Sequence, residues 1–199
     1  MRSMVEGALI VTAGSPVNMH TADDILEFWF VECTKEQWFG GGPDFDAALA
    51  ARFIDTHAAV AAGEAWTWRS TPRGRLAEVI VLDQFSRQIH RGTARAFASD
   101  PMALALAQEA VYAGLDQQLT PMPERMFLYM PFMHSESLVV HEEAVRLFTT
   151  LGSEDVLNYE IAHRDLLRRF GRYPRRNEPL GRVSTPEEVE YCASEEGKW

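Results

Sequence analysis

The sequence predicts an all-α fold of about eight helices stacked as antiparallel hairpins, and three observations support this prediction. Helix start signals and stopping glycines follow one another at intervals of a helix length along the chain. Between them, apolar residues recur with the spacing of one helix face, and no segment alternates polar with apolar residues as a strand does. Hydrophobic residues make up 46% of the 199 residues, which is enough for a sizeable core.

In the first half of the chain, the helices are predicted mainly from their N-terminal caps. Thr21 caps the first helix, and Thr71 followed by Pro72 caps the third and places a proline at its first helical position. Each of the other two helices begins at an acidic residue that follows a break containing glycine or serine. The four predicted helices cover residues 23–31, 44–62, 72–89 and 100–114.

Start and stop signals predict four more helices in the second half. Pro131 interrupts the first of them, Ser135 serves as the N-cap of the next, and Gly171 ends the third. Thr185 and Glu188 have the spacing of a capping box, which predicts that a terminal helix begins there. The other three predicted helices cover residues 121–130, 135–151 and 153–170.

The sequence predicts a flexible N-terminal tail over residues 1–19 and a single helical domain over residues 20–199. No apolar run approaches the roughly 18 residues that cross a bilayer, so we expect a cytoplasmic protein without membrane contact. Cys33 and Cys192 have no metal-ligand spacing, and no phosphate-binding glycine motif is present. We therefore expect no bound metal and no cofactor.

The charge is unevenly distributed along the chain. The whole sequence has a net charge of −10, but residues 163–182 contain seven arginines and two acidic residues, which gives 7 − 2 = +5 there and −10 − 5 = −15 elsewhere. The acidic remainder disfavours nucleic acid as a partner. The arginine-rich segment either binds an anion or forms ion pairs with that acidic remainder.

Ionisable residues interrupt the apolar faces of three predicted helices. Asp83 and Arg87 are four residues apart on one helix face, where they can form an ion pair. Histidines lie within or beside the apolar stripes of the two later helices. Six residues are candidates for one shared polar pocket: Asp83, Arg87, His134, Glu136, His141 and His163.

Two interpretations of these six residues remain open. In the first, each is a satisfied structural group, as a histidine on an apolar helix face usually is. In the second, they converge on one pocket, because ionisable groups that converge from several helices mark functional clefts. A metal site is disfavoured: Glu160 and His163 have the carboxylate–histidine spacing of di-metal bundles, but no second pair accompanies them.

Six stretches of the chain occur together in a fixed order. They are ILEFWF at 25–30, LDQFSRQIHR at 82–91, AFASD at 96–100, YMPFMHSE at 129–136, HRDLLRRFGRYPRRN at 163–177 and RVSTPEE at 182–188. In this order they resemble a bacterial family known as domain of unknown function 924, with His141 where that family usually has glutamine. The resemblance implies a tetratricopeptide-like α-hairpin fold and no established activity.

The sequence leaves three functional hypotheses. In the first, the arginines and histidines bind an anionic small molecule or an acidic peptide. In the second, the protein is a hydrolase or another enzyme in which His134 or His163 acts as general base and Asp83 or Glu136 orients it. In the third, the arginines only hold the C-terminal loop in place or serve assembly, and a homo-oligomer is left open. The residues predicted to bind a ligand are Asp83, Arg87, Arg91, His134, Glu136, His163, Arg172, Arg176 and Asn177.

Overall fold

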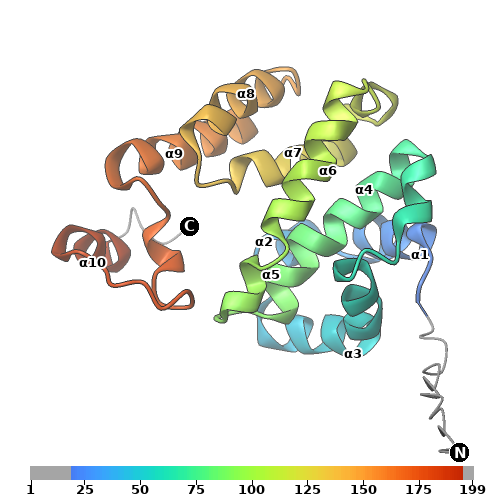
Figure 1. Ribbon diagram of the computed structural model, residues 1–199, viewed down its shortest axis with the longest axis horizontal. Helices are drawn as coiled ribbons and strands as arrows, with labels where there is room; N and C mark the ends of the chain where they lie inside the picture. The colour runs from blue at the N-terminus through green and yellow to red at the C-terminus, as the bar shows by residue number, and fades with distance from the viewer. Residues whose placement is uncertain (1–18, 195–199) are drawn as a thin grey trace, which may run out of the picture.

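A computed structural model describes residues 19–194, and within this range the chain is helical and contains no strand (Figure 1). The predicted all-α class is therefore confirmed, while the tetratricopeptide-like arrangement of the hairpins stays a prediction. The tail predicted for residues 1–19 lies outside the described residues except for Met19. Within the described range, no helix is both long and apolar enough to span a membrane.

The α-helices follow the predicted order closely. The helical stretches at residues 22–32 and 72–89 each continue through a wider turn, at residues 28–32 and 81–85. The α-helical segments are α1 (Ala22–Glu27), α2 (Lys35–Gly40), α3 (Gly42–Ala61), α4 (Pro72–Ile80), α5 (Ser86–Ile89), α6 (Asp100–Tyr112), α7 (Met126–Met133), α8 (Leu138–Thr149), α9 (Glu154–Phe170) and α10 (Pro186–Ala193).

The structure differs from the predicted helices at three places. The short helix α2 was not predicted, although Thr34 and Gln37 form a capping box at its start. Pro131 lies inside α7 and does not interrupt it, because every residue of α7 is buried and this packing outweighs one lost backbone hydrogen bond. Ser135 does not cap α8, because α8 begins at residue 138. The Ser135 carbonyl accepts a hydrogen bond from His141 Nε2 instead.

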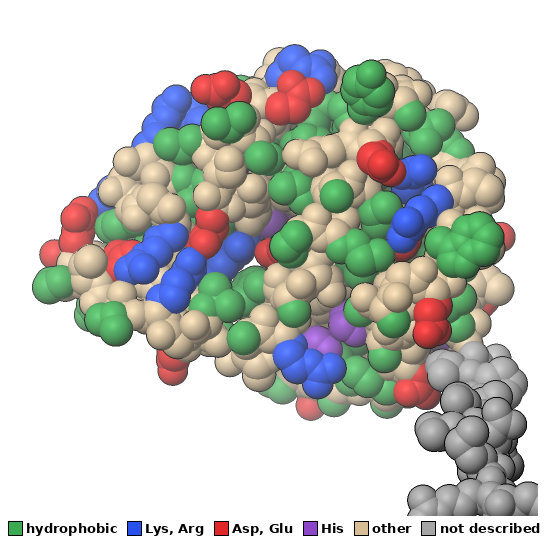
Figure 2. All heavy atoms as spheres, in the orientation of Figure 1, with side chains coloured by type: hydrophobic (Ala, Val, Ile, Leu, Met, Phe, Trp, Pro, Cys, Tyr) green, Lys and Arg blue, Asp and Glu red, His purple; other side chains and the backbone are tan. Residues whose placement is uncertain are grey.

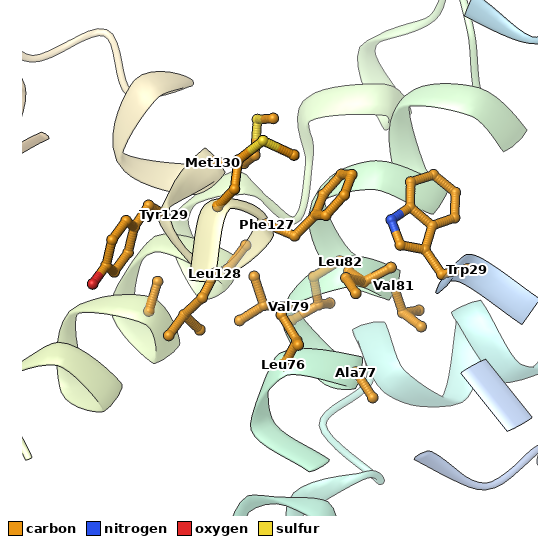
Figure 3. Packing of buried hydrophobic residues seen from close by; sticks show 14 of the residues in the cluster. Trp29, Leu76, Ala77, Val79, Val81, Leu82, Phe127, Leu128, Tyr129 and Met130 are labelled. Atoms are coloured by element: carbon orange, nitrogen blue, oxygen red, sulfur yellow. The ribbon is translucent and has the colours of Figure 1, made fainter. Parts of the chain in front are cut away.

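The main core lies between α4 and α7, with α1, α3 and α6 packed around them. Figure 3 shows Phe127 and Leu128 of α7 among the apolar side chains of α4 and the turn that follows it. The rings of Trp29 and Phe127 meet edge to face, with centroids 5.5 Å apart. This core joins residues from both halves of the chain, so α7 is fixed against α4.

The C-terminal part of the chain is held by less apolar surface. α8 and α9 pack against each other as a hairpin, and α7 contacts both. Beyond α9, a small second apolar cluster forms from Leu166, Leu167, Tyr173 and Tyr191. Figure 1 places α10 at the edge of the molecule. Because this cluster is small, polar contacts contribute much of what positions the segment after α9.

Gly171 ends α9 as predicted and turns the chain back toward the helical body. Its φ of 73° is left-handed, a conformation that glycine adopts without steric penalty. A Cβ added there would meet no atom within 4 Å, so any penalty of a substitution comes from the backbone alone.

The change Gly171→Ala is therefore expected to lower the free energy of unfolding by about 1–2 kcal/mol, the penalty of a left-handed L-residue. Urea denaturation followed by circular dichroism measures this value. Gly40→Ala is the matched control, because Gly40 lies in α2 without a positive φ and its added Cβ also meets nothing. Equal effects of the two substitutions would show that the turn at Gly171 does not depend on glycine.

Candidate functional site

A cavity of about 210 Å³ lies where the segment after α9 meets the helical body. Four elements besides α9 contribute to its wall: α5, the turn at residues 94–97, the turn at residues 174–176 and α10. Figure 2 shows basic side chains gathered on the face formed by α10 and the segment before it. The lining residues are Arg87, Phe97, His163, Leu166, Tyr173, Pro174, Arg175, Arg176 and Tyr191.

Asp83 is the buried acidic centre behind this cavity. Its side chain has no exposed surface, and its carboxylate accepts hydrogen bonds from His134 Nδ1 at 2.8 Å and from Gln84 Nε2 at 2.6 Å. Arg87 Nη1 lies 3.0 Å from Asp83 Oδ1. Burial opposes ionisation of Asp83, but Arg87 and His134 outweigh it, so the pKa of Asp83 lies well below its usual value. Asp83 is thus a carboxylate at neutral pH.

Arg87 lines the cavity but is bound on its inner side by two carboxylates. Besides Asp83, it binds Asp100 through two parallel hydrogen bonds, Nη1 to Oδ1 and Nη2 to Oδ2, both 2.9 Å. Burial acts to lower the pKa of Arg87, but the two carboxylates raise it overall. The sequence had indicated Asp100 only as a helix start, and nothing in the sequence placed it against Arg87. The predicted ion pair of Asp83 and Arg87 is present.

Arg176 has weaker charge compensation than Arg87. Its Nη2 donates to the His134 carbonyl at 2.8 Å, and its Nη1 reaches Asp100 Oδ2 only at 3.4 Å. The Cζ of Arg176 lies 4.9 and 4.6 Å from the ring centroids of Phe97 and Tyr173. Burial, and then the nearby Arg87, lower the pKa of Arg176 below its usual value. Since arginine stays protonated in proteins, Arg176 is a cation whose contact with Asp100 is longer than those of Arg87.

His163 and His134 lie near each other beside this cation. Their ring centroids are 6.4 Å apart. His163 Nδ1 donates to the Tyr159 carbonyl at 2.8 Å, yet burial lowers the pKa of His163 to about 3. Burial also lowers the pKa of His134, helped by Arg87 and opposed by Asp83. Both rings are therefore neutral at pH 7 and add no charge to the cavity.

Glu136 lies on the far side of Tyr173 and does not line the cavity. It binds Arg182 through two hydrogen bonds of 2.7 and 2.9 Å and accepts one from the Tyr173 backbone N–H at 2.8 Å. Burial opposes its ionisation, but these donors lower the pKa of Glu136 overall. The Tyr173 hydroxyl donates to the Met133 carbonyl at 2.6 Å. Glu136 and Arg182 thus hold Tyr173 in place. Tyr173 forms part of the cavity wall, and the sequence did not indicate this role.

His141 belongs to a separate buried group. Its Nδ1 lies 2.6 Å from Glu160 Oε1, and its Nε2 lies 3.0 Å from the Tyr173 hydroxyl. Burial raises the pKa of Glu160, and His141 opposes this rise. His141 therefore supports Tyr173 from behind.

The structure separates three further predicted ligand-binding residues from the cavity. Arg91 forms two hydrogen bonds with Asp46, on α3. Arg172 binds Glu188 through bonds of 2.7 and 2.8 Å, and this lowers the pKa of Glu188 to about 2. Asn177 is buried and donates to Ser184 Oγ at 3.0 Å. Arg172 and Asn177 therefore hold the loop before α10.

The local charge at the cavity is positive. Arg87, Arg175 and Arg176 line it, and Asp83 and Asp100 lie behind it, which gives 3 − 2 = +1. Among the lining residues that the structure describes, none is acidic. Within residues 19–194, the hydrogen bond recorded for the Arg175 guanidinium is a long one of 3.5 Å to the Cys192 carbonyl. In the same range, no three His, Cys, Asp or Glu side chains gather as they would around a metal ion.

Comparison with known proteins places this site in a family. Residues 25–196 match the family described as bacterial protein of unknown function, DUF924. The chain belongs to the DUF924 family. A solved structure of a protein of unknown function from Agrobacterium tumefaciens is 38% identical, with a TM-score of 0.81 over 86% of this chain and 96% of that chain. The comparison with curated proteins gave no match.

In this DUF924 protein, Asp83→Ala is expected to lower the free energy of unfolding by about 3–5 kcal/mol, because Arg87 loses its buried counter-charge and keeps only the partly exposed Asp100. Urea denaturation at pH 7 measures this loss. Glu143→Ala is the control, since Glu143 forms an exposed ion pair with Arg146 that contributes less than about 1 kcal/mol. A loss below 1 kcal/mol for Asp83→Ala would show that the buried network is dispensable.

Buried neutral histidines are expected to make the protein less stable as the pH falls. Burial lowers the pKa of His57 to about 4 and that of His163 to about 3, from 6.5. Between pH 6.5 and 4 the unfolded chain therefore binds more protons, so the free energy of unfolding falls as the pH is lowered through this window. Urea denaturation at pH 7 and pH 5 measures the drop, and His57→Gln and His163→Gln should each make it smaller. An unchanged drop in both variants would contradict this origin.

Proposed function

We propose that this protein binds a small anion in the cavity between the turn at residues 94–97 and α10. The observation that carries this proposal is the cavity lining, which brings together three arginines and, among the described residues, no acidic residue. Hydrogen bonds from arginine to a carboxylate or phosphate are charge-assisted and strong, so a cavity of this kind selects an anion.

The three arginines have different roles in this proposal. Arg87 is held by Asp83 and Asp100 and supplies fixed positive charge. Arg176 is held by the His134 carbonyl and two aromatic rings, and an anion would compensate its charge. Arg175 is exposed and lines the cavity, so its charge is accessible to a ligand.

The size of the cavity favours a small molecule over an acidic peptide. Its volume of about 210 Å³ is below the roughly 300–1,000 Å³ of sites for drug-sized ligands. A peptide would need a longer groove with backbone partners. We therefore choose the small anion from the two ligand classes that the sequence left open.

An enzyme is the second candidate, and one observation favours it. The buried Asp83 carboxylate binds His134 Nδ1 at 2.8 Å, an arrangement that orients a neutral histidine for general-base chemistry. Nε2 would then be the nitrogen that accepts a proton. His134 is not among the residues that line the cavity, so the anion-binding function is better supported.

The proposal is tested by isothermal titration calorimetry at low ionic strength with acetate, benzoate and inorganic phosphate. We expect saturable binding of at least one of these anions, weakened about tenfold or more in Arg176→Gln, because one charge-assisted contact contributes about 1.5–3 kcal/mol. Circular dichroism checks that the variant is folded.

Arg168→Gln is the matched control. Like Arg176→Gln, it removes one positive charge. Arg168, however, lies exposed on α9, pairs with Asp165 and does not line the cavity. The proposal is wrong when none of the three anions binds, or when Arg176→Gln and Arg168→Gln weaken binding equally.

A further inference from the structure

We infer that the ligand of this cavity is an aromatic monocarboxylate, with one carboxylate attached to a single aromatic ring. This inference rests on the proposed anion-binding function and adds the chemical class of the anion. Four features of the cavity support it: the composition of its walls, the orientation in which Arg176 is held, the net charge and the volume.

The walls of the cavity are mostly aromatic and apolar. Phe97, Tyr173 and Tyr191 contribute rings, and Leu166 and Pro174 complete the apolar surface. Both tyrosines are buried, with 6% and 4% of their surface exposed, so their rings are fixed parts of the wall. Rings prefer other rings as neighbours, in stacked or edge-to-face geometry, beyond the gain from apolar burial alone.

Arg176 is held in place and keeps N–H donors for a ligand. Its Cζ lies 4.9 and 4.6 Å from the ring centroids of Phe97 and Tyr173. Two of its five N–H donors are used in the hydrogen bonds to His134 and Asp100. An edge with in-plane donors matches the two oxygens of a planar carboxylate.

A phosphate fits this cavity less well than a carboxylate. At neutral pH phosphate carries more than one negative charge, whereas the arginines and the carboxylates behind them leave a local charge of 3 − 2 = +1. Its additional oxygens would also face rings and apolar side chains, where unpaired polar atoms are unfavourable. His163 does not change this balance, since burial keeps the ring neutral at pH 7.

The volume is consistent with one ring and one carboxylate. At about 210 Å³ the cavity is smaller than the sites of drug-sized ligands, which favours a single-ring body. A carboxylate without an apolar body, such as acetate, would leave the half-buried ring of Phe97 uncovered. A single ring covers it.

The inference is tested by measuring the affinities of five probes for the full chain by isothermal titration calorimetry. The probes are benzoate, acetate, cyclohexanecarboxylate, benzyl alcohol and inorganic phosphate. We expect benzoate to bind about tenfold tighter than acetate and about threefold or more tighter than cyclohexanecarboxylate, because the cyclohexane ring is apolar but not aromatic. Benzyl alcohol, which has the ring without the charge, should bind at least about tenfold more weakly than benzoate.

Variants test whether the preference for an aromatic ligand arises at the cavity wall. Phe97→Leu keeps an apolar side chain but removes a ring, and we expect it to abolish the preference for benzoate over cyclohexanecarboxylate. Phe39→Leu is the matched control, since Phe39 is exposed on α2 and does not line the cavity. The ligand series on the unchanged chain decides the question even where Phe97→Leu does not fold.

Failure of this inference is distinguishable from failure of the proposed function. Arg176-dependent binding of acetate, cyclohexanecarboxylate or phosphate as tight as that of benzoate overturns the aromatic class and leaves the anion-binding function in place. The absence of Arg176-dependent binding for all the anions overturns both.

Discussion

The negative charge of Asp83 lies inside a helical core, where an isolated carboxylate would be strongly unfavourable. Arg87, His134 and Gln84 replace the water that this carboxylate has lost. Through Arg87 the same network reaches Asp100 at the start of α6, and through Asp100 it reaches Arg176 of the C-terminal segment. One buried charge thus sets the positions of the helical stretch at residues 72–89, of α6 and of the cavity wall.

Such a network specifies geometry more than it adds stability. A buried ion pair gives little net stabilisation compared with apolar residues of the same volume, but its hydrogen bonds are satisfied in only one arrangement. The segment after α9 has only a small apolar cluster of its own. Arg172 with Glu188 and Arg182 with Glu136 fix this segment by directed contacts instead. The arginine-rich segment therefore divides into arginines that hold the fold and arginines that face the cavity.

This division is compatible with two of the hypotheses that the sequence left open, the structural one and the anion-binding one. The contacts of Arg172 and Arg182 describe a structural clamp. Arg175 and Arg176 lie at a cavity with aromatic walls, and the clamp keeps those walls in place by holding Tyr173. In this view the proposed binding role depends on the structural one, because the clamp holds a residue of the cavity wall.

The sequence alone determined the features whose partners are close along the chain. The left-handed end of α9 at Gly171, the capping box of Thr185 and Glu188, and the pair of Asp83 with Arg87 all rest on interactions within one helical turn. Their geometry follows from local backbone and side-chain spacing, which the sequence displays directly.

Only the tertiary structure decided which arginines face the cavity. Arg176 and Asp100 are 76 residues apart in sequence, and Arg91 and Asp46 are 45 apart, so nothing local indicates either pair. An arginine side chain is long and can reach any of several acidic residues in a chain this acidic. The choice is made by the packing of α7 against α4 and of the C-terminal segment against the body, because that packing sets which charges come within hydrogen-bond distance.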